Sequence, residues 1–178
     1  DLLGYSMGGN VALHTAMRHP EVVRKLIVVS IAIKSEGWYP QARAGFQAIS
    51  GEAARTWTDS PVYQAYASVA PHPEAWPALA DKVGAMVRRE YDWSPAVAGL
   101  NMPTLIVVGD ADGMSPAHAV EFFQLLGGGQ REGSWDGTGM PNAQLAIFPG
   151  TTHYDILFSP LLTPAVEAFL NKPAPAGN

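Results

Sequence analysis

The sequence has 178 residues, 47% hydrophobic and 15% charged, which is enough for one globular domain with a sizeable core. Its net charge is −5 and its basic runs are pairs such as Arg24-Lys25, which argues against nucleic-acid binding and against an anionic membrane surface. It contains no cysteine, which excludes disulfides and thiolate chemistry and favours a reducing cytoplasm. No apolar run reaches membrane-spanning length.

The first elements predict a strand, a helix and a second strand. Leu2-Leu3-Gly4-Tyr5 is typical of the end of a buried strand, and 7–19 has the periodicity of a helix. The helix should end at His19-Pro20, because the residue before proline is pushed out of the helical region. Leu26–Val29 is a short β-branched run, typical of a strand covered on both faces of a parallel sheet.

The chain opens at Asp1, inside the first strand pattern and without a start methionine. We therefore expect a fragment or processed product whose N-terminal strands are absent. Between Leu2 and Ser6 there is neither charge nor proline, the residues that usually protect an exposed strand edge. We expect this strand to pair with an upstream segment of the same protein, or to mediate self-association.

Residues 33–100 contain no convincing strand, and their short helical patterns are interrupted by six prolines, Pro40, Pro61, Pro71, Pro73, Pro77 and Pro95. This pattern predicts a helical lid inserted between two core segments, 1–32 and 101–172.

The second core segment resumes the alternation of strands and helices. Strands are expected at 104–108 and 145–148, and helices at 116–126 and 161–170. A glycine-rich surface loop is expected at 127–142, and a flexible tail at 173–178. The alternation predicts an α/β fold with a mostly parallel sheet and flanking helices.

Gly4, Ser6 and Gly8 match the pattern G-x-S-x-G between the first strand and the first helix. Such a serine sits on a sharp turn where neighbouring backbone comes close, and glycine two residues to either side removes side chains that would clash. The helix N-terminus places positive partial charge where an oxyanion would develop.

Three motifs in this order, GYSMGG, PTLIVVGDAD and FPGTTH, resemble the α/β-hydrolase fold family over nearly the whole chain. The resemblance implies that Ser6 is the nucleophile and that His153 is the base. It implies that Asp112, the last aspartate of its motif, is the acid, while Asp110 is a turn residue. It also implies an acyl-enzyme mechanism with Met7 N–H as one oxyanion donor and no metal or organic cofactor.

The second oxyanion donor would come from a loop upstream of Asp1, so we expect the chain alone to be a poor catalyst. A calcium loop built from Asp110, Asp112 and Glu121 is rejected, because Ser115 stands where glycine is required. No zinc motif is present. His118 could border the site, but we expect a surface histidine.

The lid is rich in aromatic residues, which suggests a small apolar ester as substrate; the alternative is that the rings form the lid's own core. Candidate pocket residues are Trp38, Tyr39, Trp57 and Trp93. Lactonase, thioesterase, carbon–carbon bond hydrolase and cofactor-free haloperoxidase or perhydrolase activities use the same triad and remain open. A non-catalytic binding protein is the alternative from another class, and a complete triad argues against it.

Overall fold

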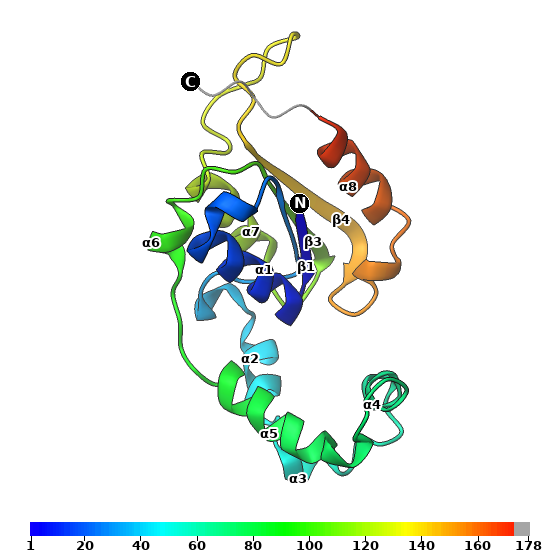
Figure 1. The fold of residues 1–178 in the computed structure, drawn as a ribbon. Helices are drawn as coiled ribbons and strands as arrows, with labels where there is room; N and C mark the ends of the chain where they lie inside the picture. Colours follow the sequence, from blue (N-terminus) through cyan, green and yellow to red (C-terminus); the bar gives the residue numbers. More distant parts are fainter. Residues whose placement is uncertain (173–178) are drawn as a thin grey trace. The chain divides into compact units, whose positions relative to one another are not determined.

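Four parallel strands form the sheet of the structure, a computed structural model that describes residues 1–172 (Figure 1). The elements follow in the order β1 (Leu2–Tyr5), α1 (Met7–Arg18), η1 (Pro20–Val22), β2 (Leu26–Val29), η2 (Ser35–Gly37), α2 (Pro40–Gln47), α3 (Gly51–Ala54), α4 (Pro61–Ala67), η3 (Pro73–Ala75), α5 (Trp76–Val87), α6 (Ser94–Val97), β3 (Thr104–Ala111), α7 (Pro116–Leu125), β4 (Ala143–Thr152), η4 (Ile156–Phe158) and α8 (Leu162–Asn171). No helix in this range is long and apolar enough to cross a bilayer.

The strands pair in sequence order, β1-β2-β3-β4, and every pair is parallel. Leu2 is level with Leu26, and Leu26 with Thr104, so the strands enter the sheet in step. Their carboxyl ends therefore meet at one edge. The predicted α/β architecture with a parallel sheet and flanking helices is confirmed.

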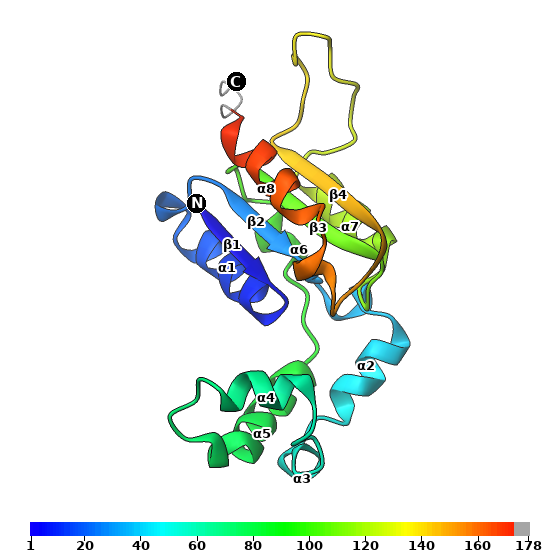
Figure 2. The same cartoon turned by 90° about the vertical axis from the view of Figure 1, so that its right-hand side faces the viewer.

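Helices cover both faces of this sheet, as the uninterrupted apolar run of β2 predicts. Leu26 and Val28 belong to a core cluster that includes residues of α1 and α7, whereas Ile27 and Val29 belong to a second cluster with Phe169 of α8. All four β2 side chains are buried. Figures 1 and 2 show α8 on the sheet face opposite α1 and α7.

β3 and β4 extend beyond the predicted strands at 104–108 and 145–148. The two strands pair with each other past the end of their apolar runs, through a register shift between Gly109 and Ala111. Hydrophobic periodicity does not reveal this extension, because most of the added positions are glycine or polar residues, such as Asp110, Gln144 and Thr152.

The chain divides into two compact units, one formed by 1–39 and 91–178 and the other by 40–90. The second unit lies within the predicted lid, 33–100, whose first and last residues belong to the first unit. Lys34 forms a β-bridge with Asp92 and Trp38 forms one with Met114, so both flanking segments are hydrogen-bonded into the first unit.

The second unit, residues 40–90, is helical and has its own small core. Trp76 is buried beside Ala54 and Ala80, and its indole nitrogen donates to Ala54 O at 3.0 Å. Trp57, Tyr63 and Tyr66 pack against this cluster. Several predicted lid aromatics therefore form the core of the unit in which they lie.

Segments outside these elements include the predicted surface loop. Residues 127–142 contain neither helix nor strand, and Trp135 is fully exposed. The predicted tail, 173–178, lies outside the described residues.

β1 is an outer strand of the sheet, and its Leu3 is 46% exposed. Pairing of this edge with an upstream segment or a second copy stays a prediction.

Lys25 joins the start of β2 to the end of α8. Its side chain is 2% exposed, and Nζ donates to the carbonyl oxygens of Phe169 at 2.9 Å, Leu170 at 3.0 Å and Lys172 at 2.6 Å. The last carbonyls of a helix have no intrahelical donor and carry negative partial charge. A buried ammonium group therefore caps α8 and fixes it against the sheet.

Lys25→Met should lower the free energy of unfolding by about 1.5–3 kcal/mol, because hydrogen bonds from a charged donor to buried carbonyls are lost. Urea unfolding followed by circular dichroism measures the change. Lys82→Met, at an exposed position of α5, is the matched control and should leave stability unchanged. Equal midpoints for both variants would contradict the capping role.

Candidate active site

Ser6 lies on the turn between β1 and α1, which begins at the next residue. Its backbone has φ 51° and ψ −124°, a conformation that costs a non-glycine residue free energy. Ser6 N donates to Val29 O at 2.9 Å and Ser6 O accepts from Asn10 N at 3.1 Å, so β2 and α1 hold the strained turn from both sides.

The close approach of backbone at this turn falls on Gly4 and Gly9. A Cβ atom on Gly4 would lie 2.3 Å from Gly8 O, and one on Gly9 would lie 2.5 Å from Ile31 Cγ2. A Cβ on Gly8 would meet nothing within 4 Å, so the expected clash at Gly8 is wrong. Gly8 instead supplies the backbone that Gly4 must accommodate.

Ser6, His153 and Asp112 form one chain of hydrogen bonds. Ser6 Oγ lies 3.0 Å from His153 Nε2, and His153 Nδ1 lies 3.1 Å from Asp112 Oδ1. The Asp112 side chain is fully buried, whereas that of His153 is 19% exposed. The three groups come from the turn after β1, the loop after β3 and the loop after β4, at one edge of the sheet.

The Asp112 carboxylate is held by three donors. Oδ1 also accepts from Met114 N at 3.1 Å, and Oδ2 accepts from the Ser30 hydroxyl at 2.5 Å. Burial raises the pKa of Asp112, but the hydrogen bonds from His153, Ser30 and Met114 outweigh burial and hold the pKa below its ordinary value. Asp112 is therefore an anion although it is removed from water.

Asp110, the other candidate acid, is exposed and does not face His153. Its Oδ1 accepts from Thr151 N at 3.2 Å, which joins the ends of β3 and β4. This contact is of the kind expected for a turn residue that binds nearby backbone.

Tyr5, the residue before the serine, holds the loop that carries His153. Its hydroxyl donates to His153 O at 2.6 Å, and the two rings lie 5.3 Å apart. Burial and the nearby Asp112 charge raise the pKa of Tyr5, so the hydroxyl stays protonated and acts as a donor. Sequence reasoning did not identify Tyr5 or Ser30, because their partners lie 148 and 82 residues away along the chain.

Met7 is the first residue of α1. The first backbone N–H groups of a helix have no intrahelical acceptor and carry positive partial charge. Met7 N–H is thus available beside Ser6, as the predicted oxyanion donor would need to be.

Of the predicted pocket residues, Trp38 lies beside His153. Its ring centroid is 5.9 Å from that of His153, and its indole nitrogen donates to Tyr91 Oη at 2.8 Å. Trp93 stacks on Tyr91 at 4.2 Å and packs against the core of the first unit. Tyr39 is 43% exposed in the same unit, whereas Trp57 belongs to the core of the second unit.

His118 is buried, so the expected surface position is wrong. Its side chain is 3% exposed; Nε2 accepts from Ile33 N at 3.1 Å, and Nδ1 lies 3.0 Å from Glu121 Oε2. Glu121 also pairs with Lys34. Burial lowers the pKa of His118 more than the Glu121 carboxylate raises it, so the imidazole is neutral and joins the segment after β2 to α7.

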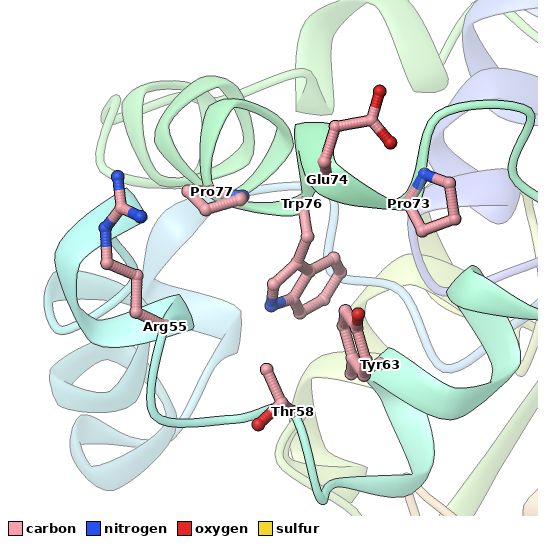
Figure 3. A pocket seen from close by; sticks show the side chains of 7 residues that line it. All are labelled: Arg55, Thr58, Tyr63, Pro73, Glu74, Trp76 and Pro77. Carbon is pink, nitrogen blue, oxygen red and sulfur yellow. The ribbon is translucent and has the colours of Figure 1, made fainter.

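A pocket of about 270 Å³ lies within the second unit (Figure 3). Its lining residues are Arg55, Thr58, Tyr63, Pro73, Glu74, Trp76 and Pro77. None of them is a predicted site residue. Within residues 1–172, no cluster of three or more histidine, aspartate or glutamate side chains is arranged to hold a metal ion.

Over most of its length the chain is similar to one protein family. A sequence profile described as "Alpha/beta hydrolase family" matches residues 1–168. Polyketide synthase ThaQ of Burkholderia thailandensis is 29% identical over 195 residues, covering 96% of this chain and 8% of that protein. Pimeloyl-[acyl-carrier protein] methyl ester esterase of Yersinia enterocolitica is 27% identical over 177 residues, covering 89% of this chain and 64% of that protein.

Among solved structures, the meta-cleavage product hydrolase from Pseudomonas fluorescens is similar in fold. The TM-score is 0.63 at 19% identity, and the match covers 95% of this chain and 63% of that one. The chain therefore spans less than two thirds of the length of these proteins.

Tyr5→Phe should slow the reaction of Ser6 with a small phosphonate by about threefold to tenfold. The loss of one hydrogen bond, worth roughly 0.5–1.5 kcal/mol, loosens the loop that carries His153. Mass spectrometry of the labelled protein over time measures the rate. Tyr154→Phe is the control, because Tyr154 is 83% exposed and its ring also adjoins His153. Equal labelling rates in both variants would contradict the role of the Tyr5 hydroxyl in holding the loop that carries His153.

His118→Gln should reduce the loss of stability on acidification. Below pH about 6.5 the unfolded state takes up a proton that folded His118, with its lowered pKa, does not, so stability falls as pH falls. Urea midpoints at pH 7 and pH 5.5 measure this loss, and exposed His19→Gln is the control. The prediction fails if both variants lose as much stability as the unchanged protein.

Proposed function

The chain belongs to the alpha/beta hydrolase family, and we propose that it is a serine hydrolase that cleaves a small apolar carboxylic ester through an acyl-enzyme. The observation that carries this proposal is the hydrogen-bonded series Ser6, His153 and Asp112 at a strained strand-to-helix turn. The donor and acceptor at each hydrogen bond of this series follow from the charge of Asp112. As an anion it only accepts, so His153 Nδ1 carries the proton and Nε2 is left to accept from Ser6 Oγ.

Acylation begins when Ser6 Oγ attacks the carbonyl carbon of the ester and its proton passes to His153 Nε2. Asp112 stabilises the imidazolium and keeps the ring in place. The carbonyl oxygen becomes an oxyanion beside Met7 N–H. The carbon–oxygen bond to the alcohol then breaks, and the alcohol leaves with the proton from Nε2.

Deacylation repeats these steps with water. His153 takes a proton from water, the hydroxide attacks the acyl carbon, and the bond to Ser6 Oγ breaks as Oγ regains a proton. The products are the carboxylic acid and the free serine. Every proton moves between Ser6, His153, water and substrate, so the cycle closes without a further reactant.

Two observations favour an apolar ester. The Trp38 ring adjoins His153, where it would contact a substrate group held at Ser6. One relative is named for a methyl ester that it hydrolyses. Lactones, thioesters, carbon–carbon bond cleavage and perhydrolysis need the same triad, and rates on a panel of p-nitrophenyl esters, lactones and thioesters would separate these activities.

Labelling of the full-length protein with a fluorophosphonate tests the proposal independently of substrate. Ser6 should be the labelled residue, as identified by peptide mass spectrometry. Ser6→Ala should abolish labelling and lower ester hydrolysis by about a thousandfold or more, and adding His153→Ala should lower it little further, because triad members act as a unit.

Ser68→Ala is the control, since Ser68 is exposed in the second unit. Circular dichroism establishes that each variant is folded. Unchanged hydrolysis in folded Ser6→Ala would end the serine-hydrolase proposal.

A further inference from the structure

Ser30 is a buried serine in a conformation that suits glycine better. It directly follows β2, its side chain is 0% exposed, and its φ is 57°. A left-handed conformation at a residue with a Cβ atom costs free energy that glycine avoids. A second cost is the burial of a hydroxyl, which must be hydrogen-bonded to be tolerated. Both costs are present in one residue beside the candidate triad.

The backbone and the hydroxyl of Ser30 are each fixed by β3 and its loop. Ser30 N donates to Val107 O at 2.9 Å, which continues the ladder between β2 and β3. Its Oγ donates to Asp112 Oδ2 at 2.5 Å, a contact between two buried groups. The positive φ ends the strand at this residue, and the side chain reaches sideways to the neighbouring loop.

The two oxygens of Asp112 have different partners. Oδ1 accepts from His153 Nδ1 and from Met114 N, both at 3.1 Å, whereas Oδ2 accepts from Ser30. A carboxylate held through Oδ1 alone can rotate about its Cβ–Cγ bond. A donor on Oδ2 prevents this rotation and satisfies an oxygen that is out of reach of water.

We propose that Ser30 is a positioning residue of the triad, whose hydroxyl fixes the Asp112 carboxylate so that Oδ1 stays aligned with His153. This inference rests on the proposed serine-hydrolase function and deepens it. Ser30 acts through Asp112 and does not contact the reacting atoms. Its hydroxyl also stabilises the ionised form of Asp112, so its removal should let the carboxylate take up a proton at higher pH.

The test uses Ser30→Gly in the full-length protein, because glycine removes the hydroxyl and relieves the positive φ together. The folded state should be retained, while the rate of Ser6 labelling by a fluorophosphonate should fall by about tenfold or more, as expected for a hydrogen bond to a charged group. The acidic limb of the pH–rate profile should move to higher pH. Ser30→Cys, which keeps the shape with a weaker donor, should give an intermediate rate.

A double-mutant cycle separates positioning from a general structural effect. In an Asp112→Asn background, Ser30→Gly should change the remaining rate by less than about twofold, because the carboxylate that Ser30 orients is gone. Ser35→Ala is the matched control, since Ser35 is buried in the same connection and binds Tyr91 N. It should label at the unchanged rate.

The outcomes distinguish this inference from the proposed function. If the unchanged protein is not labelled at Ser6, the serine-hydrolase proposal fails and the role of Ser30 fails with it. If the unchanged protein is labelled and folded Ser30→Gly reacts equally fast with the same pH profile, only the Ser30 inference is overturned. The Ser30 inference is also overturned if Ser30→Gly slows labelling by the same factor in the Asp112→Asn background as it does when Asp112 is present.

Discussion

Parallel pairing of β1, β2, β3 and β4 is the constraint on which the candidate site depends. Because neighbouring strands run the same way and enter in step, the residues that follow them meet at one edge. Ser6, Ser30, Asp112 and His153 follow the four strands in turn. Each strand supplies one member of a continuous hydrogen-bonded series, although the residues span most of the chain.

The buried carboxylate of Asp112 sets the local energetics of this edge. Removing an anion from water is costly unless donors replace the lost hydration. Here the donors come from a serine hydroxyl, a backbone N–H and the imidazole that the anion orients. The strained backbone at Ser6 and Ser30 is maintained because the ladder between the strands fixes both residues.

The second unit contributes a different kind of structure. Its aromatic residues are placed mainly to bury one another around Trp76, so their abundance in the sequence reflects a small core as much as a substrate. Trp38 and Trp93 belong to the first unit, because the segments beside residues 40–90 are bridged to it. A recognition surface for substrate therefore cannot be inferred from aromatic composition alone.

The sequence by itself determined the positions of the four strands and of α1, α7 and α8, the glycine-flanked turn at Ser6 and the order of the three motifs. These features are local, since hydrophobic period, proline and glycine act over a few residues. Only the tertiary structure shows that Asp112 contacts His153 whereas Asp110 binds Thr151 N, and that His118 and Lys25 are buried. It also places Tyr5 against His153 and Ser30 against Asp112. The reason is that these roles depend on partners far along the chain, and a side chain's burial and hydrogen bonds are set by which strands become neighbours.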